Sequence, residues 1–168
     1  MYPITWDIIS NNYDPHWINN TMEHTIVLNQ SSNQWDNEDK TLILGFLEYC
    51  FSELHVTSPV TIKLEHEAKE NIDIGVKLNL RLAFVDLENR LIIVYCKNRG
   101  LLDILRSIAH ELIHVQQLDL GLLTTSTQIE FYLPTPDSSG YEFEYEAYGL
   151  SGIMVRNYRA VLNGANNE

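Results

Sequence analysis

The chain has 168 residues, of which 45% are hydrophobic, and its 11 basic and 23 acidic residues give a net charge of −12. This length suits one globular domain with a sizeable core, so we expect residues 1–168 to form a single domain. The negative charge argues against binding to nucleic acid or to an anionic membrane. No apolar run is long enough to cross a bilayer and no signal peptide is recognisable, so we expect a cytoplasmic protein. Cys50 and Cys96 lie in separate apolar segments, which predicts buried free thiols.

The N-terminal part combines a poorly patterned segment with one clear helix. Residues 1–37 show little periodicity, so we expect an irregular arm with only a short β-like run at 25–28. Asn37, Glu38 and Asp39 then supply capping and early-turn acids for a helix that ends near His55. Its apolar residues recur at helical spacing and are Leu42, Ile43, Phe46, Leu47, Cys50, Phe51 and Leu54.

The middle of the chain predicts β-structure. Apolar and β-branched residues indicate strands over 60–64, 78–85 and 91–96, with a polar loop over 65–75 and a turn at 86–90. Since these strands are close in the sequence, we expect local hairpins and therefore a short, mostly antiparallel sheet. Together with the predicted helices, this pattern is typical of an α+β domain.

The strongest signal for function is the sequence HELIH at positions 110–114. It lies in a segment, about 101–118, whose apolar residues recur at the three- and four-residue steps of an amphipathic helix. At about 100° per residue, positions i and i+4 lie about 40° apart on a helix, so His110 and His114 can bind one metal ion. Glu111 projects beside them and can hold an attacking water. The alternative is a surface helix whose two histidines contact only water or Glu111.

A second helix, predicted over 141–161, offers a third metal ligand. Its apolar residues form one stripe, and three glutamates fall in its first turns. Glu142 suits the positive end of the helix dipole. Glu144 and Glu146 flank the stripe on opposite sides, where either could face a neighbouring helix. One of them would complete a site of two nitrogens and one oxygen with water at the fourth position, and periodicity does not choose between them.

HELIH followed by a helical glutamate resembles the gluzincin branch of the zincin metallopeptidases. It is also similar to small predicted metallopeptidases of phage and bacterial genomes, over about residues 100–160. In gluzincins the ligand glutamate is commonly followed, three residues later, by a small residue that lets the two helices approach. Glu144 with Ala147 matches this pattern, whereas Glu146 with Gly149 is a weaker match and remains the alternative.

The resemblance implies a small zincin-like domain in which Zn²⁺ is held by His110, His114 and Glu144, with Glu146 as the alternative third ligand. It implies a zinc metallopeptidase acting on a peptide or protein. Zinc would lower the pKa of its bound water, and Glu111, the general base, would pass the proton of that water to the leaving amine. The alternative function is a non-catalytic or regulatory binding module on a zincin scaffold. The carboxylate of Glu111 favours the enzyme, because a scaffold without catalysis has no chemical need for it.

Further expectations concern the surroundings of this site. Many gluzincins carry Asp or Asn four residues after the ligand glutamate, where this chain has Tyr148, so Asp103 or a backbone carbonyl would orient a histidine. The resemblance also implies that strand 91–96 is an edge strand that pairs with the substrate backbone. Four tyrosines could stabilise an oxyanion, and nothing selects among Tyr132, Tyr141, Tyr145 and Tyr148. Four histidines fall outside any ligand spacing and are not assigned to the metal, namely His16, His24, His55 and His66.

Overall fold

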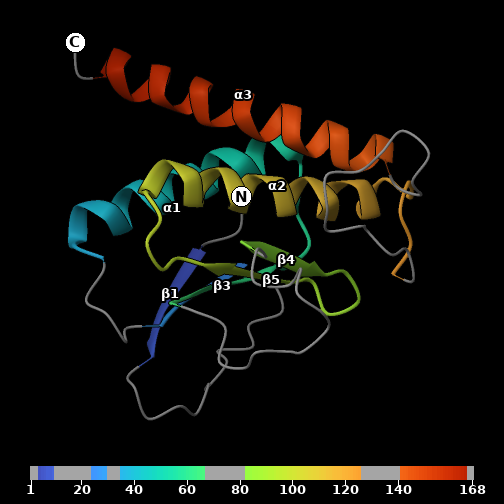
Figure 1. Cartoon of the computed structure of the whole chain (residues 1–168), viewed down its shortest axis with the longest axis horizontal. Helices are drawn as coiled ribbons and strands as arrows, with labels where there is room; N and C mark the ends of the chain where they lie inside the picture. Colours follow the sequence, from blue (N-terminus) through green and yellow to red (C-terminus); the bar gives the residue numbers. More distant parts are fainter. Residues whose placement is uncertain (1–3, 10–23, 30–34, 67–81, 126–140, 166–168) are drawn as a thin grey trace.

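The computed structural model describes residues 4–9, 24–29, 35–66, 82–125 and 141–165. In chain order these residues form β1 (Ile4–Ile9), β2 (His24–Asn29), α1 (Asn37–Leu54), β3 (Thr61–Glu65), β4 (Ala83–Asp86), β5 (Leu91–Tyr95), α2 (Leu101–Asp119) and α3 (Tyr141–Ala165). Helices α1 and α2 cover one face of the sheet, and α3 lies across the outer side of these two helices (Figure 1). The prediction of a mixed α and β fold is confirmed. Within the described ranges, no helix has the length and apolarity needed to cross a bilayer.

The sheet differs from the predicted one. Its strand order is β1-β2-β3-β5-β4, and three of its pairings, β1 with β2, β2 with β3 and β3 with β5, are parallel. Only β4 pairs in the antiparallel sense, with β5. The prediction of a mostly antiparallel sheet is therefore wrong. The prediction for 1–37 is right in one part and wrong in another: the β-like run at 25–28 is confirmed as part of β2, but β1 was not predicted.

The physical reason is the crossover between β2 and β3. Helix α1 connects these two strands, so they lie parallel in a β-α-β arrangement rather than in a hairpin. Ile26, Val27 and Leu28 of β2 are all buried, so this strand lacks the alternation of buried and exposed residues that marks a hairpin strand with one solvated face. A prediction based on sequence neighbours misses such a pairing.

Helix α1 has the predicted boundaries because both of its ends are locally encoded. The Asp36 carboxylate accepts a hydrogen bond from the Asp39 amide at 2.8 Å, and the Asp39 carboxylate accepts one from the Asp36 amide at 3.4 Å. This capping box pairs two backbone donors at the start of the helix. At the other end His55 adopts a left-handed conformation with φ of 52°, which stops the helix.

The position of β5 corrects a further expectation. β5 lies between β3 and β4, so the prediction that strand 91–96 is an edge strand is wrong, and β4 is the edge strand on this side. The predicted turn at 86–90 is confirmed, with the Asp86 carboxylate accepting hydrogen bonds from the backbone and side-chain nitrogens of Asn89 at 3.1 and 2.7 Å. Residues 78–81 of the predicted second strand lie outside the described residues.

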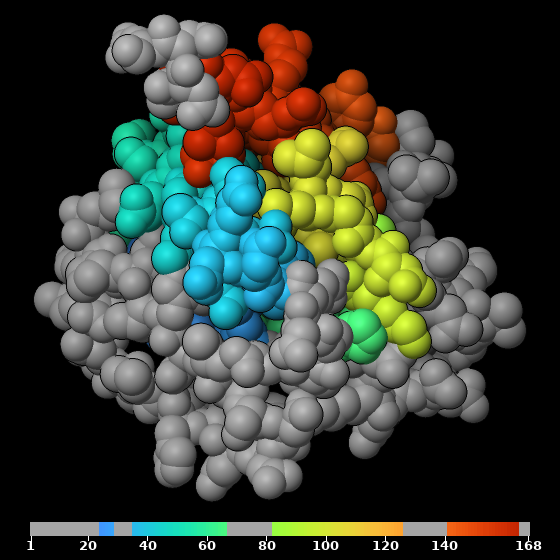
Figure 2. All heavy atoms as spheres, turned by 90° about the vertical axis from the view of Figure 1, so that its left-hand side faces the viewer, coloured from blue at the N-terminus to red at the C-terminus, as the bar shows by residue number. Residues whose placement is uncertain are grey.

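The three helices pack closely on one another and on the sheet. Figure 2 shows α1 and the first part of α2 side by side beneath α3. α3 packs against α2, and α2 also contacts β4 and β5. Cys50 and Cys96 are buried and form no disulfide, as predicted. One buried apolar cluster joins strands and helices and includes Ile26, Phe46, Ile62, Ile92, Ile108 and Met154.

Candidate metal centre

The centre is built on α2, which runs unbroken through the HELIH sequence. Leu112, Ile113 and Val115 are fully buried and anchor the apolar face of the helix. His110 and His114 lie one turn apart, with ring centroids separated by 4.9 Å. The His110 side chain is 12% exposed and that of His114 is 1% exposed. The local pattern of the helix therefore holds both imidazoles side by side at the edge of the core.

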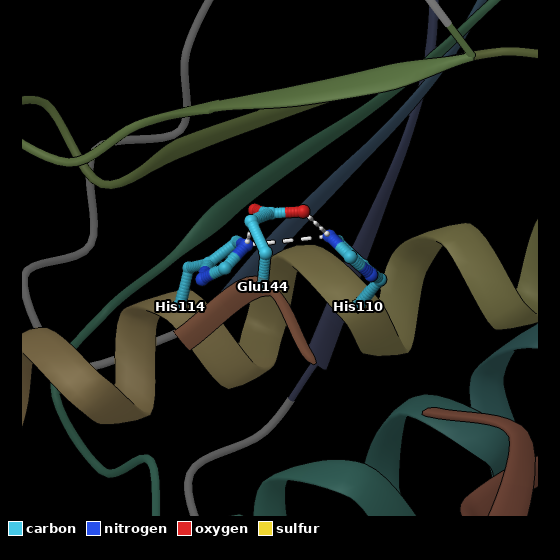
Figure 3. A group of neighbouring side chains, drawn as sticks. All are labelled: His110, His114 and Glu144. Atoms are coloured by element: carbon cyan, nitrogen blue, oxygen red, sulfur yellow. Dashed lines mark hydrogen bonds and ion pairs between the residues drawn. The ribbon is translucent and has the colours of Figure 1, made fainter. Parts of the chain in front are cut away.

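Glu144 reaches these histidines from α3 (Figure 3). Its Oε1 lies 2.6 Å from Nε2 of His114, and its Oε2 lies 3.3 Å from Nε2 of His110. The two Nε2 atoms are 3.2 Å apart. Zinc bonds of about 2.0–2.2 Å in a tetrahedral site place neighbouring ligand atoms about 3.3 Å apart, which matches the spacings of 3.2 and 3.3 Å. The 2.6 Å contact between Glu144 and His114 is a hydrogen-bond distance, which would lengthen if both atoms bound one metal ion. His110, His114 and Glu144 could thus hold a metal ion.

The two candidate glutamates occupy different environments on α3. Glu144 is 4% exposed and faces the histidines. Glu146 is exposed and accepts a hydrogen bond from Gln117 Nε2 at 2.8 Å. Ala147, three residues after Glu144, is fully buried. Among the described residues, the structure therefore places Glu144, and not Glu146, in the group that could bind a metal.

The charges of this cluster are mutually stabilising. Burial raises the pKa of Glu144, but hydrogen bonds from His110 and His114 outweigh it and lower the pKa from 4.5 to about 2. Burial also lowers the pKa of His114, but its hydrogen bond to Glu144 and the charge of Glu111 raise the pKa above its usual value overall. The Glu144 carboxylate thus favours positive charge on the neighbouring His114, and a metal ion would have to displace any proton bound there.

Glu111 lies near the three ligands but outside their group. It is 7% exposed. It directly follows His110 on α2, and its charge contributes to the raised pKa of both His114 and Tyr148. A carboxylate in this position can accept a proton from a group held at the cluster.

Tyr148 lies beside the cluster, one turn after Glu144 on α3. Its ring stands edge to face against His110, with centroids 4.6 Å apart. Burial, followed by the charges of Glu144 and Glu111, raises the pKa of Tyr148, so its hydroxyl stays protonated and can donate a hydrogen bond. The rings of Tyr141 and Tyr145 pair with each other instead, and Tyr145 is 69% exposed. Tyr132 lies outside the described residues.

The structure also identifies a partner for His114 that the sequence reasoning did not assign. His114 Nδ1 lies 2.8 Å from Oε1 of Gln117, a residue that is 1% exposed. Asp103, offered by the sequence together with a backbone carbonyl as a group that could orient a histidine, instead pairs its carboxylate with Arg99 at 2.7 Å. The signal for Gln117 was its position three residues after His114, which places the two side chains on the same face of α2.

The other histidines that the structure describes lie outside the cluster, as expected from their spacing. His24 is buried in β2, where its ring stacks on Phe51 at a centroid distance of 3.6 Å. His55 ends α1, and His66 follows β3. His16 lies outside the described residues.

Comparison of the chain with protein-family models, with curated proteins and with solved structures finds no match.

Proposed function

We propose that this chain is a zinc-dependent metallopeptidase with a zincin-like fold, in which His110, His114 and Glu144 hold the metal and Glu111 is the general base. The observation that carries the proposal is the approach of the Glu144 carboxylate, from α3, to within 2.6 and 3.3 Å of two imidazoles on α2. Two imidazole nitrogens and one carboxylate oxygen match the ligand set of catalytic zinc sites that keep one position for water.

A bound Zn²⁺ would lower the pKa of a water molecule and polarise the carbonyl group of a substrate. Glu111, buried beside the ligands, would accept a proton from that water and deliver it to the leaving amine. The Tyr148 hydroxyl, kept protonated by its raised pKa, would donate a hydrogen bond to the oxygen that gains negative charge. The proposed site thus has an acceptor and a donor of protons close to the same three ligands.

The edge strand of the sheet is the reason for proposing a peptide as the substrate. β4 is the edge strand next to β5, and both strands contact α2, the helix that carries the two histidines. An extended peptide can add to an edge strand as a further strand of the sheet. β4 therefore takes the role that the sequence assigned to strand 91–96.

The test is to measure metal content and hydrolysis on the same purified protein. We expect about one zinc per chain, and hydrolysis of a fluorescently labelled peptide library. Glu111→Gln should keep the zinc and lose activity by about 10²-fold or more, because the proton acceptor is removed. Glu144→Gln should lose zinc, whereas Glu142→Gln, a change of an exposed glutamate on the same helix, should alter neither property.

Two results would contradict the proposal. A protein that contains no zinc, and whose stability is unchanged by His110→Ala in the presence of added zinc, has no such site. Zinc bound with no hydrolysis of any library peptide, and no difference between the wild type and Glu111→Gln, would instead favour a binding module on this scaffold.

A further inference from the structure

We propose that Glu146 is a positioning residue, which sets the orientation of the metal ligand His114 by acting through Gln117. Gln117 Nε2 donates a hydrogen bond to Glu146 Oε2 at 2.8 Å, and Gln117 Oε1 lies 2.8 Å from His114 Nδ1. The three side chains form one continuous chain of hydrogen bonds from α3 to α2. This inference rests on the proposed function, because it treats His114 as a metal ligand.

The partners of Gln117 determine which way its amide group points. Its NH₂ group faces two acceptors, the Glu146 carboxylate at 2.8 Å and the Phe143 backbone carbonyl at 3.2 Å. A reversed amide would direct its own oxygen at these two acceptors, and both hydrogen bonds from Gln117 would be lost. The amide oxygen therefore faces His114.

The amide orientation in turn determines the role of each nitrogen of His114. Since Gln117 Oε1 only accepts hydrogen bonds, His114 Nδ1 must carry the hydrogen between them. The lone pair of the neutral ring is then on Nε2, the atom that faces His110 and Glu144. This is the tautomer that a metal ligand requires, and the outer hydrogen bond also holds the plane of the ring.

Glu146 contributes more to fixing the Gln117 amide than the Phe143 carbonyl does. Its hydrogen bond is the shorter of the two, and its acceptor carries a full negative charge, which strengthens the bond. Gln117 is 1% exposed, so few water molecules are available to replace a lost partner. Glu146 itself is exposed, which makes it replaceable without disturbing the core.

Glu144 and Glu146 give helix α3 two different roles at the site. Glu144 would bind the metal directly, and Glu146, two residues later, supports a ligand on the other helix. A loss of metal affinity on replacing Glu146 would therefore not identify it as a ligand. The experiment must separate an effect transmitted through Gln117 from direct coordination.

The test measures zinc affinity by competition with a chromogenic chelator, in the full-length protein. Glu146→Leu should weaken zinc binding about tenfold, and Gln117→Leu by about 10- to 100-fold, the range typical of lost outer partners of metal-bound histidines. Glu146→Gln should retain most of the affinity, because its amide oxygen can still accept from Gln117. Glu142→Leu, an exposed change on the same helix, is the matched control and should have no effect.

Two further measurements distinguish the inference from its alternatives. In a Gln117→Leu background, Glu146→Leu should cause no additional loss, because its path to His114 is already broken. The visible absorption of the Co²⁺-loaded protein should keep its wild-type shape in Glu146→Leu, because the three ligands are unchanged.

The inference is overturned if Glu146→Leu leaves the zinc affinity unchanged, costs the same in both backgrounds, or alters the Co²⁺ spectrum. The last two results would indicate direct coordination by Glu146. If the wild type binds no zinc, the proposed function itself fails. If the wild type binds zinc and Glu146→Leu gives one of the three results above, only this inference fails, so the two failures are distinguishable.

Discussion

Protonation of His24 should destabilise this protein at acid pH. His24 is 2% exposed, stacks on Phe51, and accepts a hydrogen bond at Nδ1 from the Val60 amide at 3.2 Å. Burial and then the charge of Arg90 lower its pKa from 6.5 to about 4, although a backbone hydrogen bond with Val56 acts in the opposite direction. The neutral ring thus joins β2 to the start of β3 and to the end of α1.

The sign and size of the effect follow from the lowered pKa. The unfolded chain takes up a proton at His24 near pH 6.5, whereas the folded chain does so only near pH 4, so acid favours the unfolded state. The stabilisation is complete above about pH 6.5 and is lost as the pH falls through this window. At about 1.4 kcal/mol for each pH unit, the free energy of unfolding should fall by at most about 3 kcal/mol.

Urea unfolding at pH 7 and pH 4, in the presence of a chelator, measures this loss. The comparison is between the wild type and His24→Gln, which does not titrate, so that the contributions of all other groups cancel. The stability difference between the two proteins should shrink by up to about 3 kcal/mol at pH 4. His55→Asn, a change of the exposed histidine at the left-handed position after α1, should follow the wild type. An equal difference at both pH values would refute the reasoning.

Three other predictions follow from contacts around the site and the helices. Tyr148→Phe should lower kcat about 10²-fold without changing zinc content, because one donor to the developing oxyanion is lost; an unchanged kcat would exclude this role. A Cβ at Gly45 would overlap the Tyr158 hydroxyl, so Gly45→Ala should destabilise the protein by about 1–3 kcal/mol in urea unfolding. In a Tyr158→Phe background the same change should become neutral or stabilising, and a persistent cost would show that the clash is elsewhere. Arg90 pairs with Asp119 and donates to the carbonyls of Ser58 and Pro59, so Arg90→Met should cost about 1–3 kcal/mol in thermal unfolding, and Asp119→Asn about 1 kcal/mol or less. Equal losses from these last two changes would mean that the carbonyl contacts contribute nothing.

The sequence alone was sufficient for features that depend on residues one or two helical turns apart. Local spacing along one helix predicts the start of α1 near Asn37, the approximate bounds of α2 and the side-by-side placement of His110 and His114. It did not identify Asp36 as the N-cap residue of α1. The sequence also placed two glutamates at the start of α3. These features are predictable because helix geometry is the same wherever the helix packs.

Features that join distant segments required the tertiary structure. Glu144 and Glu146 flank the same apolar stripe, and their positions became distinct only when α3 packed on α2 and directed Glu144 toward the histidines and Glu146 toward Gln117. The parallel pairing of β2 with β3 depends likewise on a crossover through α1, and the edge position of β4 depends on the pairing of β3 with β5. Local hairpin signals report neither of these pairings. The reason is that periodicity specifies which face of an element is buried, but not which neighbour covers that face.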